Sequence, residues 1–268
     1  MSPTLMAGFL YLGAGIGMGA IAFFRRAAHR PRGGERFVKA DLPFVLGMIV
    51  LDIAAPILLL FGLRSTTAAN ASLLNNFEIV ATALIALLLF KEAIAPRLWA
   101  GIAFVTASCA LLSAVDLSAF DFSPGSLLIL LAAVCWGLEN NCTRRLASKD
   151  PLEIVLLKGI FSGGGSIAIG LLAGERLSSA WSVFAVLGVG LVAYGLSIFF
   201  YVYAQRRLGA ARTSAYYAVA PFIGVLLSLL LFREWPHFTF WIALVLMGLG
   251  AWLSASDGSL FPRRRSPS

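Results

Sequence analysis

Four ionisable side chains lie deep inside long apolar stretches of this 268-residue chain. They are Asp52, Glu78, Glu139 and Lys158. A charged side chain at the centre of a lipid bilayer costs at least about 2.5–3.5 kcal/mol, so each is a candidate for ion or substrate handling. Asp52 and Glu78 both lie near the middle of their stretches. Two buried carboxylates at one depth can share and exchange a proton, so this pair is a candidate for proton coupling. Alternatively, each hydrogen-bonds to a neighbouring Asn or Ser and only holds helices together.

Glu139 and Lys158 flank a short polar turn around Ser148, nine residues before it and ten after it. In an antiparallel helical hairpin this spacing brings the two side chains to the same depth, which predicts an ion pair. A structural staple is the favoured interpretation, with little net stabilisation. The alternative is that Lys158 receives a substrate carboxylate or phosphate while Glu139 turns to another partner. Arg144 and Arg145 lie close enough along the helix to compete for Glu139.

Amide and phenol side chains accompany these charges. The amides Asn75, Asn76 and Asn140 should face the protein interior, because lipid leaves polar groups unsatisfied. Tyr216 and Tyr217 occupy the matching stretch of the second half of the chain. Together with Glu78 they predict a pocket for an amphipathic zwitterion or an aromatic metabolite. The alternative is that both tyrosines are packing residues with locally satisfied hydroxyls.

The composition excludes most other sites. The chain is 59% hydrophobic and 13% charged, and its mean hydropathy of +0.87 is far above that of a soluble domain. The two His and three Cys residues form no metal-ligand or CxxC pattern, so neither a metal nor a cofactor is expected. The net charge of +8 sits in short segments between apolar runs, which indicates membrane topology and anionic-lipid contact and gives no sign of nucleic-acid binding.

Apolar runs long enough to cross a bilayer recur along the chain and predict an all-α integral membrane protein with nine spans. The predicted spans are Thr4–Phe24, Leu42–Gly62, Ala68–Phe90, Arg97–Val115, Gly125–Leu146, Leu152–Gly174, Trp181–Ala204, Ala210–Phe232 and Phe238–Ser256. In the connections and the tail, 17 Lys and Arg residues fall on one side and only Arg64, Arg176 and Arg233 on the other. Positive charge is retained in the cytoplasm, so the C-terminus is predicted to be cytoplasmic.

The chain contains an internal repeat. A shift of 142 residues places Leu88–Glu92 on Leu230–Glu234 and Trp99 on Trp241, and a shift of 148 places Pro3 on Pro151 and Gly15 on Gly163. The matched ends fall on opposite sides of the membrane, which predicts inverted five-helix units. Residues 1–116 would form a first unit that lacks its first helix, residues 117–258 the second, and residues 259–268 a tail. We therefore expect the complete fold to have ten helices, the first of which is missing from this chain.

These repeats resemble EamA-type members of the drug/metabolite transporter superfamily. The motifs that carry the resemblance are Asn76-Phe77-Glu78-Ile79-Val80, Val219-Ala220-Pro221-Phe222 and Cys135-Trp136-Gly137-Leu138-Glu139-Asn140-Asn141, together with the Leu-Phe-(Lys/Arg)-Glu helix ends. The resemblance implies a non-enzymatic carrier with both termini cytoplasmic, which moves small organic metabolites by alternating access.

The resulting hypothesis is a multi-pass exporter in the cell (inner) membrane, with amino acids or similar amphipathic compounds as favoured substrates. Proton coupling through Asp52 or Glu78 belongs to this hypothesis. An intramembrane enzyme is disfavoured, because no GxGD or HExxH motif and no Ser–His set lies within a span. The alternatives that stay open are a membrane scaffold or subunit, against which the buried charges argue, and a channel, against which the repeat argues.

Overall fold

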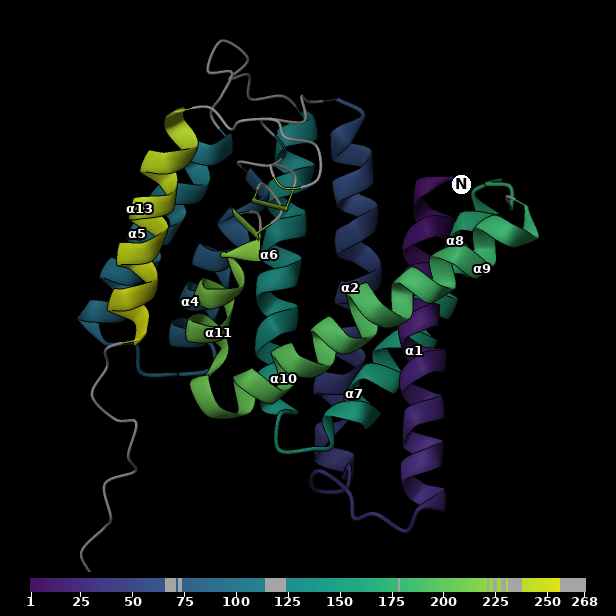
Figure 1. Cartoon of the computed structure of the whole chain (residues 1–268). Helices are drawn as coiled ribbons and strands as arrows, with labels where there is room; N and C mark the ends of the chain where they lie inside the picture. The colour runs from purple at the N-terminus through teal and green to yellow at the C-terminus, as the bar shows by residue number, and fades with distance from the viewer. Residues whose placement is uncertain are drawn as a thin grey trace, which may run out of the picture.

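The protein is a bundle of helices (Figure 1). The computed structural model describes residues 1–65, 71, 74–113, 124–177, 179–220, 222–223, 226–227, 230 and 238–255. Within these residues no β-strand forms, and a single isolated bridge joins Glu35 to Lys149. The prediction of an all-α protein is confirmed. The repeat positions at 68–70, 221 and 231–237 lie outside the described residues.

The helices follow the predicted spans closely. Their bounds are α1 Pro3–Ala27, η1 Lys39–Asp41, α2 Leu42–Leu63, α4 Phe77–Leu88, α5 Pro96–Ser113, α6 Pro124–Arg145, α7 Pro151–Leu157, η3 Lys158–Ser162, α8 Gly163–Leu172, α9 Ala180–Val189, η4 Gly190–Leu196, α10 Ser197–Leu208, α11 Ala210–Tyr217 and α13 Phe238–Ala255. Proline stands in the first turn of α1, α2 and α7, where its missing N–H costs nothing.

Several of these segments can cross a bilayer. Pro3–Ala27, Lys39–Leu63, Pro124–Arg145, Pro151–Leu172 and Ala180–Leu208 are long and apolar enough to do so, while Phe77–Leu88, Pro96–Leu111 and Phe238–Ser254 are apolar but shorter. Large apolar side chains such as Trp181, Phe184 and Leu172 are exposed on the outside of the bundle, as a lipid-facing surface requires. Of the predicted span Ala210–Phe232, α11 covers the first residues, and about half of the remainder lies outside the described part.

Two spans contain a wider turn that the sequence did not predict. η3, between α7 and α8, and η4, between α9 and α10, are π-helical. In a π-helix each N–H bonds to the carbonyl five residues earlier, so the side chains around the turn are re-aimed. η3 begins at Lys158, and η4 contains Tyr194, so both wide turns carry polar side chains at mid-span.

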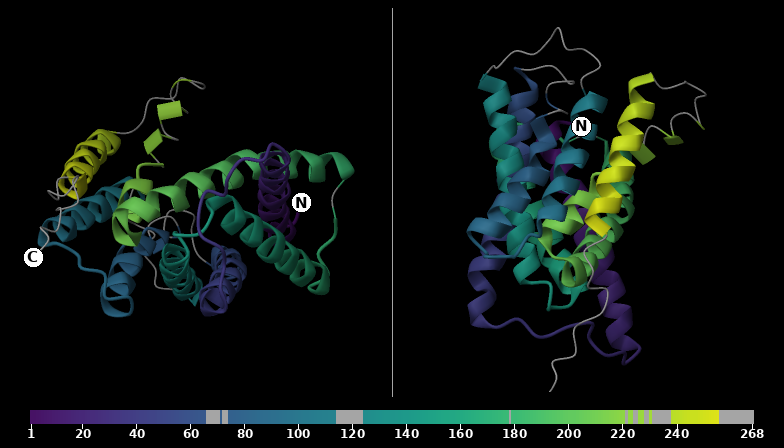
Figure 2. Two further views of the ribbon diagram at one scale, coloured as in Figure 1. Left: turned by 90° about the horizontal axis from the view of Figure 1, so that it is seen from below. Right: turned by 90° about the vertical axis from the view of Figure 1, so that its left-hand side faces the viewer.

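Two compact regions flank the centre of the bundle. At one side α5 packs against α13, and the backbones approach closely at Gly101 and Gly250. At the other side α1 packs against α7, η3 and α8 on one face and against α9 and η4 on another. Figure 2, viewed from below, shows α5 and α13 at one end of the arrangement and α1 near the other. The helices α2, α4, α6, α10 and α11 lie between them.

Close contact between α1 and its neighbours depends on glycine. A Cβ atom at Gly15 would lie 2.8 Å from the backbone of Gly159, and one at Gly163 would lie 2.7 Å from the backbone of Leu12. Gly13 meets the backbone of Leu187 in the same way. Glycine therefore allows backbone-to-backbone packing, as small residues do between membrane helices. Gly13, Gly15 and Gly163 thus serve helix packing.

The strap, residues 28–41 between α1 and α2, is fastened to the turn between α6 and α7. The Asp150 carboxylate pairs with Arg25 and accepts hydrogen bonds from the backbone N–H groups of Gly33 at 3.0 Å and Leu152 at 3.1 Å. Burial of Asp150 alone would raise the pKa of its carboxyl, but the bonds from Arg25, Gly33 and Leu152 outweigh the burial and hold that pKa below its usual value. The charged carboxylate thus holds the strap in place.

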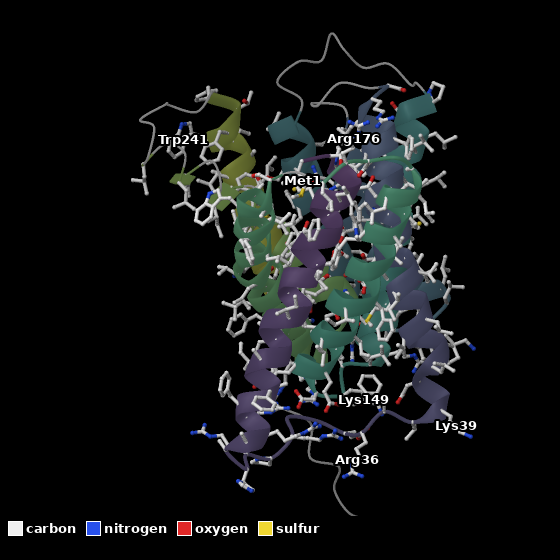
Figure 3. All side chains as sticks on the ribbon, turned by 90° about the vertical axis from the view of Figure 1, so that its right-hand side faces the viewer. Met1, Arg36, Lys39, Lys149, Arg176 and Trp241 are labelled. Atoms are coloured by element: carbon white, nitrogen blue, oxygen red, sulfur yellow. The ribbon has the colours of Figure 1, made fainter. Side chains whose placement is uncertain are left out.

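Further contacts join the strap to the same turn. Lys149 Nζ lies 3.0 Å from Asp41 Oδ2 and donates to the carbonyl of Arg36 at 3.0 Å. Arg206 of α10 donates to the carbonyls of Ala147 and Gly33. Figure 3 shows Arg36, Lys39 and Lys149 at one end of the molecule and Met1 and Arg176 towards the other. We call the end that contains the strap the basic end.

Replacing Gly159 by valine should separate α1 from η3, because the added Cβ would lie 2.7 Å from the Tyr11 carbonyl oxygen and closer still to the Gly15 backbone. We expect the free energy of unfolding to fall by about 1–3 kcal/mol or more, measured by thermal unfolding in lipid nanodiscs. Gly164→Ala is the matched control, since nothing lies within 4 Å of its new methyl group. Equal stability of Gly159→Val and Gly164→Ala would contradict this packing.

Replacing Asp150 by asparagine should loosen the strap at all pH values, measured as faster amide hydrogen exchange over residues 28–41. In the wild type, a carboxyl whose folded pKa lies below the unfolded value of about 3.9 contributes stability above that value. That contribution is lost as the pH falls through the lower folded pKa, so protection should be constant near neutrality and decline only below about pH 4. Glu35→Gln is the control, because the Glu35 side chain is 71% exposed and lies 3.5 Å from Lys149, whose closer partner is Asp41 at 3.0 Å. Unchanged exchange in Asp150→Asn would show that other contacts hold the strap.

Candidate functional site

A cavity of about 430 Å³ lies in the middle of the bundle. It is bounded by α1, α2, α4, α6, η3, η4, α10 and α11. The lining residues are Ala7, Tyr11, Asp52, Pro56, Leu59, Leu60, Asn75, Glu78, Trp136, Glu139, Asn140, Lys158, Ala193, Tyr194, Ser197, Ile198, Tyr201 and Tyr217. Its size and its mixture of apolar walls with a few polar groups are typical of a small-molecule site.

Lys158 lies between two carboxylates at the base of this cavity. Its Nζ is 2.7 Å from Glu139 Oε1 and 3.3 Å from Asp52 Oδ2, and all three residues are at most 5% exposed. The predicted ion pair between Glu139 and Lys158 is confirmed. Arg144 and Arg145, the alternative partners of Glu139, make no ion pair with it in the part of the chain that the structure describes.

Hydroxyl groups complete the coordination of the two carboxylates. Tyr11 Oη donates to Asp52 Oδ1 at 3.1 Å, and Thr143 Oγ1 donates to Glu139. The Asp52 carboxylate is paired with the Lys158 ammonium, and the role of Asp52 and Glu78 in proton coupling stays a prediction. Helices α1, α2, α6 and the π-helical η3 are thereby tied together at one point.

Glu78 stands apart from this ion-pair group. Its Oε1 accepts a hydrogen bond from Asn140 Nδ2 at 2.9 Å, and the same amide lies 3.2 Å from Thr82 Oγ1. Among the described residues Glu78 makes no ion pair. Its carboxylate therefore lines the cavity with an amide, rather than a cation, as its protein partner.

The remaining predicted site residues divide by helix face. Asn75 and Tyr217 line the cavity, whereas Asn76 and Tyr216 are not among its lining residues. Adjacent residues of a helix point about 100° apart, so the two members of each neighbouring pair differ in direction. Asn75 precedes α4 and Glu78 lies in its first turn, and both side chains line the cavity. The side-chain amide oxygen of Asn75, Oδ1, is buried and has no hydrogen-bond partner among the described residues.

Four aromatic residues of the cavity were not predicted. Tyr11, Trp136, Tyr194 and Tyr201 line it together with Tyr217. Tyr11 and Tyr194 meet edge to face with centroids 5.1 Å apart, and Tyr201 and Tyr217 do the same at 5.3 Å. Aromatic residues are common throughout this sequence, so composition gave no sign of which ones gather here. Pro56 is a lining residue inside α2.

Comparison with known proteins decides the family. Residues 1–114 and 123–256 each match the EamA-like transporter family. The chain belongs to the EamA-like transporter family. It is therefore a membrane transporter rather than an enzyme, in agreement with the sequence-based resemblance.

Relatives of this EamA protein are named as transporters, and their names state no substrate. An uncharacterized transporter of Methanothermobacter thermautotrophicus is 26% identical over 258 residues, which cover 87% of this chain and 72% of the relative. The uncharacterized inner membrane transporter YedA of Escherichia coli (strain K12) is 25% identical over 270 residues, covering 98% of this chain and 84% of YedA. A solved crystal structure superposes with a TM-score of 0.77 at 20% identity, over 95% of this chain and 88% of that one, and shares the fold.

Replacing Lys158 by methionine should destabilise this EamA protein. In Lys158→Met the carboxylates of Asp52 and Glu139 stay buried without a cation, and breaking a buried pair costs about 3–5 kcal/mol. We expect a correspondingly lower free energy of unfolding in nanodiscs.

The triple variant Lys158→Met/Asp52→Asn/Glu139→Gln tests the cause. Removing the two uncompensated charges should restore most of the lost stability, because neutral amides can still hydrogen-bond to Tyr11 and Thr143. A triple variant as unstable as Lys158→Met would show that the loss came from packing rather than from charge.

Proposed function

We propose that this EamA protein exports small amphipathic organic metabolites, amino acids and related compounds among them, by alternating access. The observation that carries the proposal is the central cavity, which is lined by Asp52, Glu78, Glu139 and Lys158. Helices from both family-matched segments contribute to its wall. A membrane scaffold has no need of charges at this depth, where they are expensive.

The proposed orientation places the basic end and the C-terminus in the cytoplasm. The excess of Lys and Arg in the connections supports this assignment. The cavity lining extends to Ala7 and Leu60, near the end of the bundle opposite the strap, while the strap contacts fasten the basic end. For this orientation we propose that the cavity is reached from the outside, with the strap contacts closing the cytoplasmic end.

The proposed mechanism uses inverted repeats, residues 1–116 and 117–258, with residues 259–268 as a tail. Contacts between predicted counterparts support it, since α1 packs on α7–α8 and α5 packs on α13. Both pairs run antiparallel, because Gly15 meets Gly159 while Gly8 meets Gly163, and Gly101 meets Gly250 while Ser108 bonds to the carbonyl of Ala243. Inverted repeats exchange conformations between their halves, which is a route to alternating access.

Proton coupling is assigned to Glu78, with Asp52 as the second candidate. Lys158 already neutralises Asp52, whereas the partner of Glu78 is the Asn140 amide. The other charged groups that line the cavity with Glu78 are Asp52, Glu139 and Lys158. A carboxylate at this depth without a cation favours binding a proton or a cationic group.

Replacing Glu78 by glutamine should abolish export. Cells that express the wild type should deplete one class of metabolite from the cytosol and accumulate it in the medium, measured by untargeted metabolite comparison of the two compartments. Glu78→Gln keeps the size and the hydrogen bond with Asn140 but removes the charge, so we expect the difference between compartments to fall to that of cells without the transporter.

Glu35→Gln is the matched control, because it removes an exposed carboxylate of the strap and leaves the cavity intact. Membrane amounts of all variants are compared by immunoblot. If the wild type and Glu35→Gln shift no metabolite while both reach the membrane, the export function is wrong, and uptake or a scaffold role takes its place.

A further inference from the structure

The charges of the cavity are unbalanced. Three carboxylates, those of Asp52, Glu78 and Glu139, line it together with one ammonium, that of Lys158. Among the described residues that line the cavity, Lys158 is the only Lys or Arg, and its Nζ is within 3.3 Å of both Asp52 and Glu139. Coulomb forces are strong where water is scarce, so a free carboxylate entering this cavity meets a net negative wall. A cation is attracted to the same wall.

The attractive groups gather at the start of α4, where Glu78 lies in its first turn and Asn75 just precedes the helix. Glu78 lacks an ion-pair partner in the described part of the chain, and the side-chain oxygen Oδ1 of Asn75 lacks a hydrogen-bond donor there. The two side chains are three residues apart and line the same cavity. Both are acceptors, so the ligand group that would satisfy them together is a donor with several N–H bonds and a positive charge. A protonated primary amine has these properties, as the donor inventory of the Lys ammonium shows.

The walls of the cavity suit the rest of such a ligand. Tyr11, Trp136, Tyr194, Tyr201 and Tyr217 come from five different helical segments and meet around the cavity. Aromatic faces attract organic cations within about 6 Å of a ring centroid and also provide apolar surface for a hydrocarbon body. Carboxylates gain nothing from these faces, because the π-face of an aromatic ring is negative.

We propose that the substrate is a small organic amine that presents its ammonium group to Glu78 and Asn75 and carries no free carboxylate. This inference rests on the proposed transport function and narrows it from amphipathic metabolites in general to amines. Within that class it excludes ordinary amino acids, because Lys158 is already held by Asp52 and Glu139 and has no free charge for a substrate carboxylate.

The test is equilibrium binding to the purified full chain in lipid nanodiscs, measured by isothermal titration calorimetry with three matched probes. Phenethylamine has the ammonium group alone, phenylalanine has the same skeleton with a carboxylate, and N-acetylphenethylamine has no charge. We expect phenethylamine to bind at least about tenfold more tightly than either other probe, since leaving a buried charged group unpaired is costly. Glu78→Gln should lower the affinity for phenethylamine to that of the uncharged probe.

Two further variants separate charge from folding. Glu78→Asp keeps the carboxylate and should retain part of the preference for phenethylamine, and Glu35→Gln should leave all three affinities unchanged. Each variant is accepted only with the thermal midpoint of the wild type. Phenylalanine binding as tightly as phenethylamine, or phenethylamine binding that survives Glu78→Gln, would overturn the amine assignment. So would the absence of binding by all three probes.

These outcomes are distinct from failure of the proposed function. The metabolite comparison is carried out without assuming a substrate class. Export of an amino acid in that comparison, without amine binding, would leave the transport function in place and reject only the amine assignment. A chain that binds phenethylamine but shifts no metabolite would keep the amine site and lose the export function.

Discussion

The structure depends on how a positive charge is held within an apolar bundle. Lys158 cannot be solvated by lipid, so its ammonium is surrounded by the carboxylates of Asp52 and Glu139. These carboxylates in turn require the hydroxyls of Tyr11 and Thr143. Satisfying one buried ion therefore fixes the relative rotation of α1, α2, α6 and η3. Lys158 is paired within this group, whereas the neighbouring Glu78 has the Asn140 amide as its partner in the described part of the chain.

Two different kinds of contact surround this centre. Towards the middle of the membrane, α1 is held by backbone packing at Gly13 and Gly15, which has no directional bonds to break when helices slide. At the basic end the strap is held by directional, charge-assisted bonds to Asp150 and from Arg206. Sliding contacts in the middle and specific bonds at one end are the combination expected of a bundle that opens and closes at its ends.

Most of the fold could be predicted from the sequence because a bilayer imposes a strict length and polarity on each span. The Glu139–Lys158 pair was also predictable, since both residues are placed by their distance from a single turn at Ser148. The contact of Asp52 with Lys158 could not be predicted, because it depends on the rotation of helices from different hairpins. The same rotation decides that Asn75 and Tyr217 face the cavity and that Asn76 and Tyr216 do not. The π-helical turns had no sequence signal at all.

The two π-helical segments set the direction of side chains within spans whose starts are capped. Asp150 caps the start of α7 and Ser179 caps the start of α9, so each of these two helices begins at an anchored residue. Tightening a π-helical turn to α-helical geometry moves the register by one residue and turns the neighbouring segment by about 100°. Lys158 and Tyr194 lie in these segments, so the π-helical geometry sets the direction in which the charge and one aromatic ring of the cavity wall point. One extra residue in each wide turn thus places these two side chains at the cavity while the helix starts stay at their capping residues.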